Sequence, residues 1–243
     1  MDDETNERIR MTRVRRSKEE ARAAYDRMSP WYDALAGSSE AAYVDAGLRK
    51  LEAEEGERIL EIGFGTGRAL VSLARSVGRA GRVYGVDLSE GMARQAKRRL
   101  QDTGLAEEVT LVRGDGARLP LQDGSLDGAF LSFTLELFDT PRIRQVLDAC
   151  GRVLKAGGRL CVVSLAKRGE GSLSVRLYEW VHNRMPRYVD CRPIPVEQVV
   201  KEAGFAIIEV EQRSMWTLPV DIVLARRALD PRVASERRDT GKR

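Results

Sequence analysis

Cysteine and histidine are scarce in this sequence of 243 residues, which has three cysteines and a single histidine, His182. The number of cysteines is odd, and no two of them have the C-x-x-C spacing of a zinc site. We therefore expect no metal centre. Cys150 falls in a predicted helix and Cys161 in a predicted strand, where cysteine is commonly buried as a small apolar residue. A reactive thiolate is therefore disfavoured.

Long hydrophobic runs are also absent. The longest apolar stretch, residues 160–166, is interrupted by Ser164 and is far shorter than the roughly 18–20 residues needed to cross a bilayer. Residues 1–16 alternate acids with arginines and contain no apolar segment, so they do not have the pattern of a secretory signal. These absences predict a cytoplasmic protein.

The charges nearly balance, with 41 basic and 37 acidic residues and a net charge of +4. This excess is too mild for a dedicated nucleic-acid binder, so no nucleic-acid partner is expected. Arginines and lysines cluster within residues 8–18 and 226–243, and a predicted helix over 172–185 carries Trp180 on its apolar side. Weak peripheral contact with a membrane is one interpretation, and solvated tails are the other. No oligomeric state is predicted.

From residue 58 onward, short apolar runs alternate with helical periods, which is typical of a parallel sheet covered by crossover helices. Later in the chain, a helix over 195–203 precedes two strands joined closely enough to be antiparallel. We predict an α/β, doubly wound, mostly parallel seven-stranded sheet with an antiparallel last strand, the Rossmann-like arrangement. The expected strands are 58–62, 82–86, 109–113, 126–133, 158–165, 205–213 and 217–225, and the crossover helices are 67–77, 89–102 and 141–155.

The N-terminal part is predicted to be helical. Ser17 can cap a helix through Met28, with Glu20 completing a capping box, and a second helix is expected over 39–52. Gly157 and Gly158 are expected to end the helix at 141–155. The predicted organisation is a mobile basic N-terminus (1–16), a helical lid (17–56), a binding domain (57–227) with an inserted helix at 172–185, and a mobile basic tail (228–243).

A glycine-rich loop, Gly63-Phe64-Gly65-Thr66-Gly67, directly follows the first predicted strand and precedes a helix. Open α/β sheets bind ligands at such turns, because glycine lets the ligand touch the backbone. A dinucleotide site has the spacing G-x-G-x-x-G, but position 68 is arginine. The loop therefore favours a ligand whose carboxylate meets the helix N-terminus, such as S-adenosylmethionine.

Asp87 ends the second predicted strand, 20 residues after Gly67. An acid at that strand end can accept hydrogen bonds from both hydroxyls of a ribose. The alternative interpretation is that Asp87 caps the helix that begins near Ser89.

Several segments in register resemble the class I S-adenosylmethionine-dependent methyltransferases, over the chain from Tyr25 to about Arg168. Within that class the sequence is most similar to the ubiquinone/menaquinone C-methyltransferase group. It departs from the group after its Tyr-Asp-x-Met segment, where the group usually has a histidine and a tryptophan, because the segment here is Ser29-Pro30-Trp31-Tyr32-Asp33 and contains no histidine. The matching segments are 25–28, 60–67, 114–120, 125–127 and 152–160.

The resemblance implies S-adenosyl-L-methionine as the cofactor. It implies that Thr66 and the glycines lie beside the methionine moiety, that Asp87 holds the ribose, and that Asp115 and Gly116 hold the adenine. Ser132 is then expected to face the cofactor, and the aromatic side chains of the N-terminal segment are expected to cover it. The full set of expected cofactor-binding residues is Glu61, Gly63, Gly65, Thr66, Gly67, Asp87, Leu88, Asp115, Gly116, Ser132, Tyr25 and Tyr32.

The expected activity is methyl transfer from S-adenosylmethionine to a small apolar or lipid-like acceptor, such as a quinol ring carbon or oxygen. His182 is the candidate base, although a helix histidine without a catalytic role is the more ordinary interpretation. Phospholipid N-methylation and a non-catalytic S-adenosylmethionine-binding protein are the alternatives. Arsenic methylation is disfavoured by the positions of Cys150 and Cys161.

Overall fold

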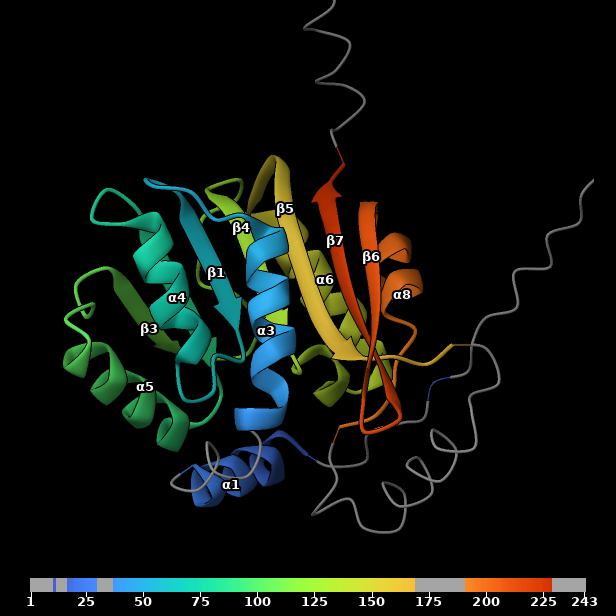
Figure 1. Ribbon diagram of the computed structural model, residues 1–243, viewed down its shortest axis with the longest axis horizontal. Coiled ribbons are helices and arrows are strands. Elements are labelled where there is room, and N and C mark those ends of the chain that lie inside the picture. Colours follow the sequence, from blue (N-terminus) through green and yellow to red (C-terminus); the bar gives the residue numbers. More distant parts are fainter. Residues whose placement is uncertain (1–10, 12–16, 30–36, 169–190, 229–243) are drawn as a thin grey trace, which may run out of the picture.

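The computed structural model describes residue 11 and residues 17–29, 37–168 and 191–228 (Figure 1). The predictions for residues 1–10, 12–16 and 229–243, for Trp31 and Tyr32, and for the helix at 172–185 with Trp180 and His182 lie outside the described residues. Within the described part of the chain, no helix is long and apolar enough to span a membrane.

The centre of the molecule is a seven-stranded sheet with the order β3-β2-β1-β4-β5-β7-β6. The first five strands are parallel, and β7 runs antiparallel to both of its neighbours. This confirms the predicted fold class. The strands are β1 (Arg58–Ile62), β2 (Arg82–Asp87), β3 (Val109–Arg113), β4 (Leu126–Ser132), β5 (Leu154–Leu165), β6 (Phe205–Met215) and β7 (Leu218–Arg227).

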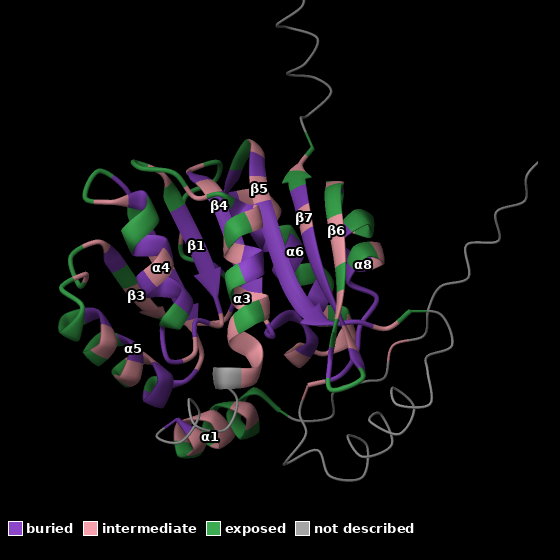
Figure 2. Ribbon diagram, in the orientation of Figure 1, coloured by how far each residue is buried: buried purple, intermediate pink, exposed green. Residues whose placement is uncertain are grey.

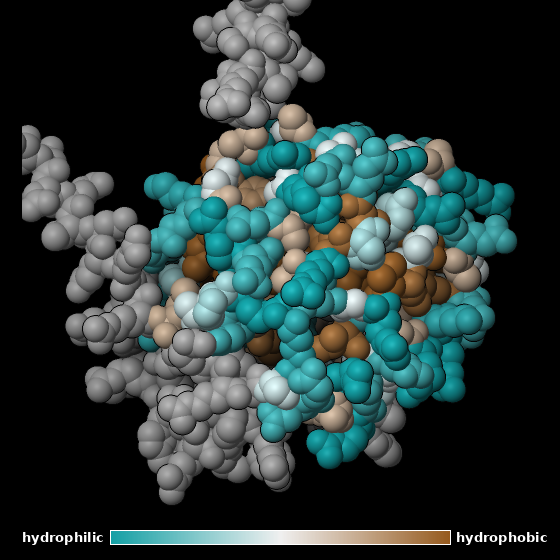
Figure 3. All heavy atoms as spheres, turned by 180° about the vertical axis from the view of Figure 1, so that it is seen from behind, coloured by the Kyte–Doolittle hydropathy of each residue, from teal (hydrophilic) through white to brown (hydrophobic). Residues whose placement is uncertain are grey.

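The helices form a layer on each face of the sheet (Figure 1). Leu51, Leu70 and Leu100 of α3, α4 and α5 belong to one buried apolar cluster, whereas Ile143 and Val199 of α6 and α8 belong to the other. Seen from behind, the second layer is mainly hydrophilic at its surface, with hydrophobic patches near its middle (Figure 3). The helices are α3 (Gly37–Leu51), α4 (Arg68–Val77), α5 (Glu90–Asp102), α6 (Thr140–Val153) and α8 (Val196–Glu202).

The prediction that Gly157 and Gly158 end a helix is wrong. Helix α6 ends at Val153, and both glycines lie inside β5, which begins at Leu154. The reason is that Leu154 already pairs with Leu126 of β4. The backbone of Gly157 has φ +76°, so the glycine allows a local irregularity in the strand and does not cap a helix.

The N-terminal helix α1 (Lys18–Met28) lies across the end of the sheet where the parallel strands finish (Figure 1). Ser17 and Glu20 form the predicted capping box. In contrast to the strands, α1 has no buried residue, and its surface is exposed or intermediate (Figure 2). Polar contacts must therefore hold much of this helix in place.

Candidate functional site

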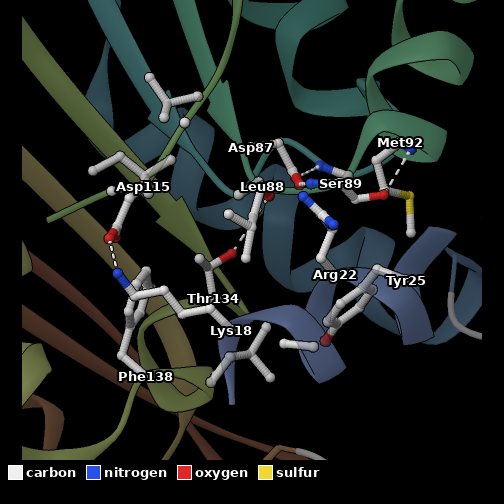
Figure 4. Close-up of a pocket in the computed structure, with 18 of the residues that line it drawn as sticks. Lys18, Arg22, Tyr25, Asp87, Leu88, Ser89, Met92, Asp115, Thr134 and Phe138 are labelled. Atoms are coloured by element: carbon white, nitrogen blue, oxygen red, sulfur yellow. Dashed lines mark hydrogen bonds and ion pairs between the residues drawn. The ribbon is translucent and has the colours of Figure 1, made fainter. Parts of the chain in front are cut away.

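A cavity lies between α1 and the carboxyl ends of β1, β2, β3 and β4 (Figure 4). This is the edge at which open α/β sheets bind ligands. Five segments form its walls: the first turns of α1, the glycine loop, the loop after β2, the turn after β3, and the chain from β4 through the short helix η1 (Leu135–Leu137) into α6.

The glycine loop forms the floor of this cavity. Gly63 has φ +72°, and a Cβ atom there would lie 2.3 Å from Thr134 Oγ1. Gly67 caps α4 with φ +81°, and a Cβ there would lie 2.8 Å from the Cβ of Ala96 on α5. Gly67 therefore provides the close packing, while Arg68 is exposed.

Asp87 ends β2 and faces the loop. Its Oδ2 accepts from the amide of Gly65 at 3.0 Å, and its Oδ1 accepts from the amide of Ser89 at 2.8 Å. Burial raises the pKa of Asp87 to about 6, although the amides of Ser89, Gly65 and Leu88 lower it. The helix-cap interpretation of Asp87 is wrong, because the N-cap of α5 is Ser89, whose hydroxyl accepts from the amide of Met92.

Glu61 lies in β1, two residues before Gly63 of the loop, and is only 2% exposed. Its Oε2 has no hydrogen-bond partner among the described residues. Burial, and then the nearby charge of Asp87, raises the pKa of Glu61 to about 8. Glu61 therefore carries a proton at neutral pH, which reduces repulsion beneath the loop.

Asp115 follows β3 and receives two cations. Arg142 of α6 donates to its two oxygens at 2.8 and 2.6 Å, and Lys18 of α1 forms an ion pair with it. Partial burial raises the pKa of Asp115, but the hydrogen bonds from Lys18, the amide of Ala117 and Arg142 hold it below its usual value. Beside it, a Cβ on Gly116 would lie 2.6 Å from Ile62 Cγ2, so only glycine fits there.

Helix α1 is attached at its other end through Asp26. Oδ1 of Asp26 accepts from the hydroxyl of Ser89 at 2.6 Å and from the amide of Gly91 at 2.8 Å. The chains approach closely here, since a Cβ on Gly91 would lie 2.6 Å from Ser29 Oγ. Helix α1 thus spans the cavity from Asp115 to the N-terminus of α5, and Tyr25 lines the cavity between these two points.

The structure brings most of the predicted site residues together. Glu61, Thr66 and Gly67 do not line the cavity, and Tyr32 and His182 lie outside the described residues. Both the carbonyl and the hydroxyl of Thr66 accept from Arg99. The predicted residues that line the cavity are Tyr25, Gly63, Gly65, Asp87, Leu88, Asp115, Gly116 and Ser132.

Sequence reasoning missed several lining residues. Lys18, Arg22 and Met92 come from helices that were predicted, but no spacing in the sequence indicates which of their side chains face a ligand. Arg142 is 27 positions from Asp115 and Lys18 is 97 positions away, so only the fold reveals these ion pairs.

A second buried acid, Glu136, lies on η1, next to the cavity wall. It is fully buried, and its Oε1 accepts from the amide of Leu165, at the end of β5, at 3.2 Å. Burial raises the pKa of Glu136 to about 8, and the charge of Glu40 on α3 also raises it. Hydrogen bonds from its own amide, from Ser164 and from the amide of Leu165 lower this pKa but do not offset the burial.

Cys150 and Cys161 are free thiols. Cys150 and Cys161 are buried, as predicted, and burial raises the pKa of each to about 12. Neither thiol is a nucleophile at neutral pH.

Residues 59–158 match the family described as a methyltransferase domain. The chain is 41% identical over 131 residues to an uncharacterized 37.1 kDa protein in a transposon of Streptomyces fradiae, which covers 54% of this chain and 36% of that protein. It is 32% identical over 145 residues to a ubiquinone/menaquinone biosynthesis C-methyltransferase of Azotobacter vinelandii, covering 60% of this chain and 55% of that protein. The chain thus spans about a third to a half of the length of these relatives.

Two solved structures share the fold. A [4+2]-cyclase, SpnF, superposes with a TM-score of 0.70 at 17% identity, covering 88% of this chain and 98% of that one. A SAM-dependent methyltransferase from Aquifex aeolicus superposes with a TM-score of 0.56 at 24% identity, covering 75% and 88%. At these identities the similarity establishes the fold alone.

Proposed function

We propose that this chain, whose residues 59–158 form a class I S-adenosylmethionine-dependent methyltransferase domain, transfers a methyl group from S-adenosyl-L-methionine to a small, lipid-like acceptor. The observation that carries the proposal is the pairing of the glycine loop with the carboxylate of Asp87 at one end of the sheet. The sequence similarity to a quinone C-methyltransferase supports the choice of acceptor class.

The cavity fits this cofactor chemically. Gly65 has φ +51°, and a Cβ built on it would meet no atom within 4 Å, so the loop leaves open space above its backbone. A carboxylate offers about four acceptor positions, and backbone amides use only part of this capacity at Asp87. The ribose hydroxyls would fill the remainder. Glu61 lies beneath the loop and lacks a partner for Oε2, and a cationic amino group bound above the loop would lower its pKa and favour its ionised form.

Each part of the cofactor has a matching group in the cavity. Gly63 and Gly65 would contact the methionine moiety, and Asp87 the ribose. Asp115 and Gly116 would bind the adenine, whose amino group needs an acceptor. Because Lys18 and Arg142 keep Asp115 ionised, it is an effective acceptor. Tyr25 and the apolar stem of Arg22 would exclude water on the α1 side.

When bound, S-adenosylmethionine supplies an electrophilic methyl group on a sulfonium. Much of the rate enhancement in such an in-line displacement comes from holding the acceptor at near-attack distance. The chain therefore needs to position the acceptor beyond β4, next to Ser132 and Phe133, and keep water out. Phe133 has φ +47°, a strained backbone for a bulky residue, which directs the chain away from β4 at this point.

Two alternatives share the same cofactor site. Phospholipid N-methylation would use another lipid-like acceptor, and a non-catalytic protein would bind the cofactor without turnover. The fold alone does not distinguish these functions, because SpnF has the same architecture and is described as a cyclase.

Incubation of the full chain with radiolabelled S-adenosylmethionine tests the proposal. The acceptors are a short-chain 1,4-naphthoquinol, phosphatidylethanolamine vesicles, and lipid and aqueous cell extracts. We expect label in the naphthoquinol or in the lipid extract. Label only in phosphatidylethanolamine supports the first alternative, and cofactor binding without any labelled product supports the second. Label confined to water-soluble products contradicts a lipid-like acceptor.

We also propose weak peripheral contact with anionic membranes, which would bring the protein to a lipid-soluble acceptor. The basic clusters near both ends of the sequence support it, because each Lys or Arg near an anionic leaflet contributes about 1 kcal/mol. Sedimentation with anionic vesicles at low salt, reversed at high salt, is the expected result. Equal recovery in the supernatant with anionic and neutral vesicles would refute it.

A further inference from the structure

Buried polar side chains also gather where β4 and β5 end and β7 begins, beyond the cofactor cavity. Glu136 and Ser164 are fully buried, and Asp221 is 6% exposed. Ser164 pairs with Asp221 in the register of β5 and β7, and Arg168 forms an ion pair with Asp221. The cofactor accounts for none of these groups, because none of them lines the cavity.

Glu136 substitutes for a strand partner. The amide of Phe133 donates to the carbonyl of Val163, which is the last bond between β4 and β5 on that side. The next amide along β5, that of Leu165, donates instead to Oε1 of Glu136. This places the carboxyl at the shared end of β4 and β5, across η1 from the cavity that Thr134 and Leu137 line.

A strand-capping role explains only one of the two oxygens. Oε2 of Glu136 is buried and has no hydrogen-bond partner among the described residues. Glutamine would accept from Leu165 equally well, but it would place a buried amide nitrogen without an acceptor at the position of Oε2 and could not exchange a proton. The sequence instead retains a group that can gain and lose a proton, with one oxygen left over.

We propose that Glu136 accepts, through one bridging water, the proton of the methyl acceptor, whose hydroxyl or amine binds over the end of β4. This inference rests on the proposed function and narrows the acceptor to molecules with an acidic O–H or N–H group. The acceptor atom gains the methyl group while the carbon–sulfur bond breaks and its electron pair returns to sulfur. The acceptor's proton passes to the carboxylate of Glu136 and later to solvent.

The surroundings of Glu136 make its proton exchange near neutral pH. Burial raises its pKa to about 8, close to the optimum for a general base. The groups that face it are the hydroxyl of Ser164 and the amide of Leu165, which lower the pKa, and Glu40 on α3, which raises it. The Asp221–Arg168 pair lies on the next strand, beside Ser164.

The decisive variant is Glu136→Gln, which keeps an acceptor for Leu165 and removes the proton acceptor. We expect at least a hundredfold loss of label transfer to the acceptor found for the wild type. S-adenosylhomocysteine affinity, measured by calorimetry, should stay within twofold of the wild type. At pH 6 the variant should unfold at the same temperature as the wild type or at a higher temperature. Label transfer within twofold of the wild type overturns the proposal, and so does a loss of S-adenosylhomocysteine affinity in proportion to the loss of transfer.

A second test uses the pH dependence of methyl transfer and does not require Glu136→Gln to fold. Wild-type transfer should rise about tenfold per pH unit below pH 8 and level off above it. Glu40→Gln removes a nearby negative charge, so the midpoint of this profile should shift to lower pH. A profile that is flat from pH 6 to 9, or that Glu40→Gln leaves in place, overturns the role of Glu136. If the wild-type protein binds the cofactor but labels no acceptor, the proposed methyltransferase function itself has failed, which is a different outcome from a failure of the role of Glu136.

Discussion

Asp87 and Glu136 are acids at the same edge of the sheet, but Asp87 is half-buried in the cavity wall, whereas Glu136 is fully buried. Asp87 receives amides from Gly65, Ser89 and Leu88, and its pKa rises only to about 6. Glu136 lies deeper, with a bare Oε2, and its pKa rises to about 8. Hydrogen-bond donors lower the pKa of both carboxyls, so the difference comes from burial. Partial exposure favours an ionised acceptor in the cofactor half, whereas full burial favours a proton-exchanging group in the other half.

The largest expected effect in the cofactor half is that of Asp87→Ala. Loss of the acceptor for the ribose hydroxyls should cost about 1.5–3 kcal/mol of binding free energy, or at least tenfold in S-adenosylmethionine affinity. Calorimetry measures the affinity, and thermal unfolding of the cofactor-free protein serves as the control. If the variant unfolds while the affinity of the remaining folded protein is unchanged, Asp87 has only a structural role.

Next in size is the effect of the buried acids on stability. The pKa of Glu136 is raised on folding from an ordinary value near 4.5 to about 8, so the native state favours its protonated form. The resulting stability is present below about pH 4.5 and is lost as pH rises toward 8. The free energy of unfolding of Glu136→Gln, taken relative to that of the wild type, should therefore be at least about 1 kcal/mol higher at pH 9 than at pH 5. Denaturant titrations at the two pH values measure this; parallel curves would contradict the raised pKa.

A smaller effect is expected where α1 meets α5. A Cβ in Gly91→Ala would lie 3.0 Å from the Cα of Asp26 as well as close to Ser29 Oγ, so α1 must shift outward. Cofactor affinity should fall about three- to tenfold, with unfolding within roughly 3 °C of the wild type, because no residue of α1 is buried. Gly151→Ala on α6, where a Cβ would meet only Phe205 at 3.7 Å, is the control for a glycine substitution away from α1. Unchanged affinity in Gly91→Ala would show that α1 does not contribute to binding.

The smallest effect should come from Lys18→Ala. Its side chain is 43% exposed, and Arg142 still pairs with Asp115. An exposed ion pair contributes about 0–1 kcal/mol, so cofactor affinity should change by less than about fivefold, and less at high salt. Arg142→Ala should have the greater effect. The reverse order would show that α1 dominates the adenine end.

The sequence was sufficient to predict the sheet and the glycine loop, because apolar periodicity and glycine spacing act locally. The end of α6 was misplaced because pairing of Leu154 with Leu126 depends on a strand distant in sequence. Asp115 was identified by its motif, but its partners Lys18 and Arg142 were not. Glu136 was missed because one glutamate in an apolar stretch gives no sign of whether its side chain points to water or into the protein.

The most direct test of the cofactor half is a calorimetric titration of the full chain with S-adenosylmethionine and, in parallel, with NAD. The carboxylate of Asp87 beside the open glycine loop predicts saturable binding of S-adenosylmethionine, weakened at least tenfold in Asp87→Ala, and no binding of NAD. Tight binding of NAD without binding of S-adenosylmethionine would contradict the central claim.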